Sequence, residues 1–276
     1  MIRLSGFADE IGPDLDLQID TLASENMKFL ELRGVWDTNV LDLIDGQCAG
    51  LRERLSDAGI GVSSIGSPIG KVRIDEPWED HVERFKIALD RAEFFDAPYI
   101  RLFSYYPPEG GRIADHRSEV IRRMNDQVEM AKGWPVTLLH ENEADIYGEK
   151  TAACLDLHEN VPGLKAVFDP ANFVQAGVRP DEAWAALKKH VVYFHIKDAV
   201  MGTGKVVPAG EGDGRIPEIL REAICERGYS GFISLEPHLA VAGQFAGFSG
   251  PDLFKKAVQT LKNILDRLGA EYDAKA

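Results

Sequence analysis

The chain alternates between two patterns of apolar residues. Short, nearly continuous apolar runs predict buried parallel strands, because such strands are covered on both faces. Between these runs, apolar residues recur every three or four positions, as at residues 82–92 and 254–268, which predicts amphipathic helices. The eight expected strands are residues 2–8, 29–34, 62–66, 99–105, 136–141, 165–169, 191–197 and 231–236.

Strand–helix alternation repeated eight times predicts the architecture. A length of 276 residues is typical of an α/β barrel. We therefore expect one α/β domain, a (β/α)8 TIM barrel over residues 1–276, whose last helix begins near Ser249 with a serine cap. The alternative is an open doubly wound sheet, but no Gly-x-Gly-x-x-Gly follows the first strand. The glycine-rich residues 210–214 follow a loop and predict a flexible turn before a helix.

Composition limits the kinds of binding partner that we expect. The net charge of −14 and the pI of about 5.0 would repel a phosphate backbone, so we expect no nucleic-acid partner. No apolar run reaches membrane-spanning length, so we expect no membrane partner. Three cysteines without a Cys-x-x-Cys motif fit a reducing cytosol, which predicts a cytoplasmic protein. The sequence leaves open whether the protein forms a homo-oligomer, and residues 245–248 are one candidate contact between subunits.

Four expected strands end on a polar side chain that an apolar core would exclude. Glu141, Asp169, His195 and Glu236 stand at the ends of strands five to eight. Alone, each would more often be a helix cap, a surface ion pair or a core histidine. Together they should converge, because strand carboxyl ends meet at one face of a barrel. Three carboxylates and an imidazole suit one divalent ion, Mn, Mg or Co, with Zn as an alternative.

Further polar residues are expected around this group. Strand alternation places Lys197 on the side of His195, and His238 on the side of Glu236. Arg33 and Arg101 lie on strands two and four, where they could contact a substrate, or a phosphate on it. No glycine-rich loop clearly suited to phosphate follows strands seven or eight, which favours an unphosphorylated substrate.

These residues also stand in recognisable motifs. They resemble the motifs of the xylose isomerase-like TIM-barrel superfamily, which includes the sugar phosphate isomerases and epimerases. The motifs are Glu141 at the end of strand five, the turn Phe-Asp169-Pro-Ala-Asn172, the strand Phe-His195-Ile-Lys197-Asp198, and Leu-Glu236-Pro-His238.

The resemblance implies a site and an activity. The four strand-end residues would hold one divalent ion, and Glu141 and Glu236 would act as an acid/base pair on a substrate carbon. Lys197 would help to hold the developing oxyanion. We therefore expect a metal-dependent isomerase or epimerase of carbohydrate metabolism, acting on a keto-sugar or polyol derivative through an enediolate. One alternative is a lyase or dehydratase of an oxidised sugar, with His238 or Lys197 as the acid. The other is a non-catalytic sugar-binding barrel.

The sequence departs from the family pattern in two places. Many relatives carry a histidine where this chain has Asn172, which we expect to hydrogen-bond a substrate hydroxyl instead. An arginine found after the strand-seven histidine in the epimerases is also missing, so the particular sugar is not implied. The same superfamily includes endonuclease IV, a DNA-repair enzyme that requires extra histidines on strands three and four. These histidines are missing here, which argues against a role in DNA repair.

Overall fold

The computed structural model describes residues 1–242 and 247–275, and all eight predicted strands are present in these ranges. Residues 245 and 246 of the candidate oligomer contact therefore lie outside the described residues. The strands are β1 (Arg3–Gly6), β2 (Phe29–Leu32), β5 (Gly61–Ile65), β6 (Tyr99–Leu102), β7 (Thr137–Glu141), β8 (Lys165–Phe168), β9 (Val191–Ile196) and β12 (Phe232–Leu235).

These strands form one parallel sheet in the order β1-β12-β9-β8-β7-β6-β5-β2. Its two edges are joined by an isolated parallel bridge between Phe7 and Glu31, just beyond β1 and within β2. The sheet is thus nearly closed into a barrel, which confirms the predicted α/β TIM-barrel fold, and the open-sheet alternative is wrong. That one domain takes up all of residues 1–276 stays a prediction.

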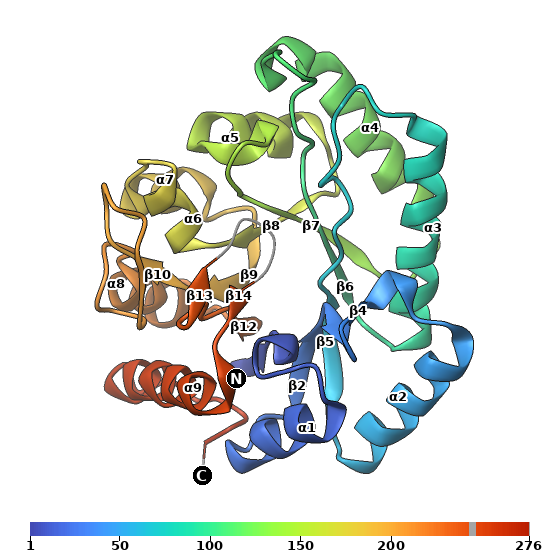
Figure 1. Ribbon diagram of the computed structural model, residues 1–276. Coiled ribbons are helices and arrows are strands. Elements are labelled where there is room, and N and C mark those ends of the chain that lie inside the picture. The colour runs from blue at the N-terminus through green and yellow to red at the C-terminus, as the bar shows by residue number, and fades with distance from the viewer. Residues whose placement is uncertain (243–246, 276) are drawn as a thin grey trace.

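Helices surround the strands (Figure 1). Both helices predicted from apolar spacing are found. In α9 (Gly250–Arg267), Phe254 and Leu265 of the expected face are fully buried, while Leu268, just beyond the helix, is partly buried. Within the described ranges, no helix is long and apolar enough to cross a membrane. The helices are α1 (Leu15–Ser24), α2 (Asp45–Asp57), α3 (Trp78–Phe94), α4 (Arg117–Met130), α5 (Thr151–Asn160), α6 (Pro170–Gln175), α7 (Pro180–Leu187), α8 (Ile216–Arg221) and α9 (Gly250–Arg267).

Short antiparallel strand pairs form within three loops of the barrel. They are β3 (Gly34–Val35) with β4 (Thr38–Asn39), β10 (Asp198–Ala199) with β11 (Val206–Val207), and β13 (Val241–Ala242) with β14 (Gly247–Phe248). All three follow the carboxyl end of a barrel strand, so they lie on the side of the candidate site.

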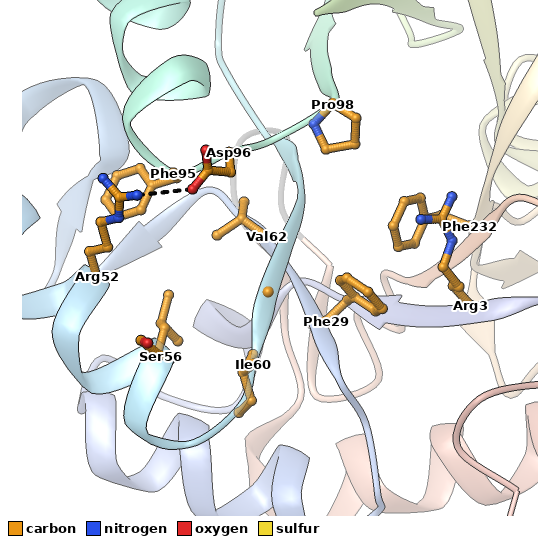
Figure 2. Close-up of a pocket in the computed structure, with 12 residues that line it drawn as sticks. Arg3, Phe29, Arg52, Ser56, Ile60, Val62, Phe95, Asp96, Pro98 and Phe232 are labelled. Carbon is orange, nitrogen blue, oxygen red and sulfur yellow. Dashed lines mark hydrogen bonds and ion pairs between the residues drawn. The ribbon is translucent and has the colours of Figure 1, made fainter. Parts of the chain in front are cut away.

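The barrel interior changes from apolar to polar along its axis. At the amino end, the rings of Phe29, Tyr99, Tyr193 and Phe232 pack edge to face or tilted against one another, with centroids 4.9–6.3 Å apart. The Arg3 guanidinium lies 3.8 Å from the Phe232 ring centroid, and Figure 2 shows both beside Phe29. These rings fill the interior of the barrel near its amino end, and the charged groups of the interior, such as Glu141 and His195, lie toward the carboxyl end.

Candidate metal centre

The four strand-end residues meet at the carboxyl end of the barrel. Glu141 ends β7, Asp169 follows β8, His195 lies in β9 and Glu236 follows β12. One ligand atom from each lies within 4.8 Å of the others, and all four side chains are buried. The predicted convergence of the four residues is confirmed.

In each carboxylate of the cluster, one oxygen faces the other ligand atoms and the second oxygen is held by a neighbouring group. Oε1 of Glu141 accepts a hydrogen bond from His195 Nδ1 at 2.8 Å, while Arg101 holds Oε2 at 3.0 Å. Oε2 of Glu236 lies 3.3 Å from Lys197 Nζ, while Arg33 holds Oε1 at 3.1 Å.

Asp169 is anchored by backbone instead. Its Oδ1 accepts the Asn172 backbone N–H at 3.0 Å, which caps α6, and Oδ2 lies 3.0 Å from Lys197 Nζ. Each carboxylate therefore keeps one oxygen for the centre, and the other oxygen fixes its direction.

His195 is held from both sides of its ring. While Nδ1 faces Glu141, Nε2 donates to Glu31 Oε2 at 3.0 Å. The same oxygen accepts the Tyr193 hydroxyl at 3.0 Å, and Ser63 lies 2.9 Å from that hydroxyl. This buried chain fixes the ring so that Nδ1 points toward the other ligands. Among the described residues, Glu31 forms an ion pair with His195, and Arg33 pairs with Asp9 and Glu236.

The charges within the cluster are strongly coupled. Burial acts to raise the pKa of Glu141, but His195 and Arg101 outweigh it and lower that pKa to about 2. Burial raises the pKa of Asp169 to about 6. Burial alone would lower the pKa of Lys197, but Asp169 and Glu236 raise it. At neutral pH the cluster therefore contains ionised glutamates beside a protonated lysine.

The residues predicted around the four-residue cluster lie beside it. Arg33 and Arg101 each contact a glutamate of the cluster, as described above. His238 Nε2 lies 3.4 Å from Glu236 Oε1. Asn172 Nδ2 is 3.5 Å from Glu141 Oε1 and donates to the Asn142 carbonyl at 2.8 Å. Their expected substrate contacts stay predictions.

Sequence analysis missed Glu10. This residue is fully buried just after β1, and its Oε2 accepts hydrogen bonds from the His238 backbone N–H and the Ser249 hydroxyl, both at 2.9 Å. Its Oε1 lies 3.3 Å from His238 Nε2, and burial raises the pKa of Glu10 to about 7. Ser249 does precede α9, but its side chain bonds Glu10 and does not cap the helix, so the predicted cap was wrong. The signal was available, because Glu10 follows the first strand as Glu141 ends the fifth.

The glycine-rich run is not a free turn. Asp198, at the end of the His-Ile-Lys-Asp motif, accepts the backbone N–H groups of Gly210, Gly212 and Gly214 at 2.7–3.2 Å. It also accepts the Ala199 N–H at 2.9 Å. A Cβ on Gly212 or Gly214 would lie 2.4 or 2.6 Å from Asp198 Oδ1. The turn does precede helix α8, but the expectation that it is flexible was wrong, because a buried carboxylate binds it.

A separate cavity of about 430 Å³ lies at the amino end of the barrel (Figure 2). Its lining includes Arg3, Phe29 and Phe232, together with the Arg52–Asp96 ion pair of 3.0 Å. No residue of the four-residue cluster lines it. Because TIM-barrel sites are built at the carboxyl ends of strands, the cluster is the better candidate site.

The cluster suits a single divalent ion. Its donors are carboxylate oxygens and one imidazole nitrogen, and their mutual distances are those of ligands around one ion. Asp169 Oδ2 is buried, and the contact that balances it is the 3.0 Å ion pair with Lys197 Nζ, which still leaves this oxygen facing the other ligand atoms. Arg33, Arg101 and Lys197 already supply part of the positive charge that three buried carboxylates require, and a divalent ion would add to it.

Comparison with known proteins agrees with this geometry. The family model of the xylose isomerase-like TIM barrel matches residues 19–264, and the chain belongs to this family. The uncharacterized protein YihM of Escherichia coli strain K12 is 26% identical over 216 residues, which are 74% of this chain. The match covers 61% of the length of YihM.

Several solved structures share the fold. A D-tagatose 3-epimerase-like protein has a TM-score of 0.76 and 17% identity, over 97% of this chain and 98% of that one. The probable 3-DHS dehydratase AsbF of Bacillus anthracis has a TM-score of 0.73 and 18% identity, over 95% and 99%. The IOLI protein, whose structure contains a zinc atom, has a TM-score of 0.74 and 15% identity, over 96% and 97%.

Proposed function

We propose that this protein is a divalent-metal-dependent isomerase or epimerase of a keto-sugar or polyol derivative. The observation that carries the proposal is the pairing of two ionised glutamates, Glu141 and Glu236, in one buried cluster with a protonated Lys197. Glu141, Asp169, His195 and Glu236 would hold the ion, which supplies positive charge that stabilises an oxyanion on the substrate.

The side chains then divide the proton transfer among themselves. One glutamate removes the proton from the carbon next to the substrate carbonyl, and the electron pair moves onto the carbonyl oxygen to give an enediolate. The other glutamate first takes up a proton from solvent and then delivers it to the opposite face of that carbon, while the first glutamate releases its proton to solvent, so both glutamates end ionised as they began. Lys197 Nζ donates a hydrogen bond to the substrate oxygen, and Asn172, Arg33, Arg101 and His238 orient the hydroxyls or the two glutamates.

Deuterium exchange tests this proposal. The Mn²⁺-loaded protein is incubated with a panel of ketoses in D2O, and deuterium on the carbon next to the carbonyl is measured by mass spectrometry. We expect exchange in the wild type and in Glu53→Gln, an exposed control on α2, and loss of about 100-fold or more in Glu141→Gln and Glu236→Gln. Full exchange in both glutamine variants would rule the proposal out.

A second candidate, β-elimination from an oxidised sugar, starts with the same proton removal. This reaction is favoured by the position of His238, whose Nε2 lies 3.4 Å from Glu236 Oε1, because an imidazole that could protonate the leaving group then lies beside the base. Here the enediolate expels a hydroxyl that His238 or Lys197 protonates. A product that lacks the elements of water and absorbs in the ultraviolet would select this reaction over epimerisation.

A further inference from the structure

Two arginines at the barrel mouth, Arg101 and Arg33, are already engaged by carboxylates of the chain. Arg101 donates to Glu141 and to the Gly66 carbonyl, at 3.0 and 3.1 Å. Arg33 donates to Asp9 at 2.6 Å as well as to Glu236. The forked donors that would bind a phosphate are therefore directed at glutamates and backbone.

The two lysines are engaged in the same way. Lys71 Nζ donates to Glu143 Oε2 at 3.1 Å, and Lys197 lies between Asp169 and Glu236. A phosphate oxygen would have to displace an acidic partner from each of these lysines, which removes most of the gain.

The backbone offers no alternative for an anion at the glycine-rich turn. Phosphates in TIM barrels are frequently bound by backbone N–H groups of the loops after the last two strands. Here the loop after β9 does present such a cradle, but Asp198 already accepts from Gly210, Gly212 and Gly214. The cradle of N–H groups holds a carboxylate of the protein itself.

The charges around the centre are also nearly balanced once a divalent ion is counted. Among the described residues, seven carboxylates lie in the cluster or pair with the cations beside it, opposite four lysine and arginine side chains. The carboxylates are those of Asp9, Glu10, Glu31, Glu141, Glu143, Asp169 and Glu236, and the cations are Arg33, Lys71, Arg101 and Lys197. A bound divalent ion would offset two of the three excess negative charges, so these four cations leave no positive charge over for an anionic substrate.

From these contacts we infer that the substrate is an uncharged polyhydroxy carbonyl compound that carries neither phosphate nor carboxylate. This inference rests on the proposed function and names the substrate class of the same site. Specificity would come from the carboxylates that neutralise the mouth, with Glu143 and Asp9 as specificity-determining residues, because each occupies a cation that could otherwise bind phosphate.

The test compares a ketose with its own terminal phosphate ester on the Mn²⁺-loaded protein. We expect kcat/KM for deuterium exchange to be about 100-fold higher for the free ketose, because the ester adds negative charge to an already neutralised site. The variants Glu143→Gln and Asp9→Asn should each narrow this ratio about tenfold by releasing Lys71 or Arg33. Glu53→Gln makes the same charge change far from the mouth and should leave the ratio as it is.

The outcomes separate this inference from the proposed function. Preferred exchange of the ester would overturn the inference and leave the epimerase proposal standing. If neither compound exchanges, the proposed function fails, and calorimetric binding of the same pair still decides the substrate class. Tighter binding of the ester, or a ratio that stays the same in both variants, would contradict the inference.

Discussion

Replacement of Glu31 by glutamine should weaken metal binding although Glu31 is not one of the expected ligands. Its Oε2 accepts from His195 Nε2 and from the Tyr193 hydroxyl, both at 3.0 Å, in a site that is almost fully buried. A carboxylate at the far nitrogen of a ligating histidine fixes the ring and makes it a better donor.

The magnitude follows from the contacts. Glutamine keeps the size and one carbonyl oxygen, so the hydrogen bond to His195 changes from charge-assisted to neutral, a loss of about 1 kcal/mol. Its amide nitrogen takes the place of Glu31 Oε1, which is buried without a hydrogen bond, but this cost falls on folding and is the same with and without metal. The weaker bond to His195 therefore predicts metal binding weaker by about tenfold.

Titration calorimetry with Mn²⁺ at pH 6.5 and pH 8 measures this change. Burial alone would lower the pKa of His195, but Glu141 and Glu31 raise it well above its ordinary value. At the lower pH the metal must therefore displace a proton from His195. Glu31→Gln removes part of this competition by lowering the pKa of His195, so the loss of metal affinity should be larger at pH 8. Tyr193→Phe removes only the second hydrogen bond to the same oxygen and should change the affinity by less than about threefold. Unchanged affinity in a folded Glu31→Gln variant, or an equal loss in Tyr193→Phe, would refute the reasoning.

Three further predictions concern stability. Burial lowers the pKa of both His81 and His158 to about 4, below the ordinary 6.5, so only the unfolded chain binds these protons between those values. The free energy of unfolding should therefore fall by about 1.4 kcal/mol per histidine for each pH unit from 6.5 to 4; a flat urea-unfolding profile over this range would contradict it. Asp198→Asn should cost about 3 kcal/mol in urea unfolding, because one amide oxygen cannot satisfy four N–H groups, and wild-type stability would count against that account. Gly70→Ala should be more damaging still, since φ is +88° and a Cβ would lie 2.0 Å from the Phe103 carbonyl oxygen; a soluble variant with an unchanged melting temperature would disprove the clash.

The sequence predicted the strands and the four-residue cluster because both depend on local pattern. Apolar runs identify strands, and the parallel barrel then brings their carboxyl ends together, so Glu141, Asp169, His195 and Glu236 needed no knowledge of packing. The structure places the ends of several strands earlier than predicted, for example β6 at Leu102 and not at residue 105. This occurs because buried residues beyond a strand keep its apolar pattern.

What could not be predicted depends on contacts between distant segments. Glu31, which bonds His195, follows a local register shift between Leu30 and Glu31 in the pairing of β2 with β5, and no pattern in the sequence marks either feature. The bond from Asp198 to the glycine-rich turn joins residues 12 to 16 positions apart, and glycine composition alone indicated mobility. Glu10 lies opposite His238 only because β1 pairs with β12, the first strand with the last.

The packed aromatic rings at the amino end of the barrel determine from which end a molecule can reach the cluster. Phe29, Tyr99, Tyr193 and Phe232 close the interior below His195, so whatever reaches the cluster arrives from the carboxyl end. Substrate and product of the proposed reaction would then share one entrance, and the product would have to leave before the next substrate enters. The reverse reaction would meet the same groups by the same route, as the proposed epimerisation requires.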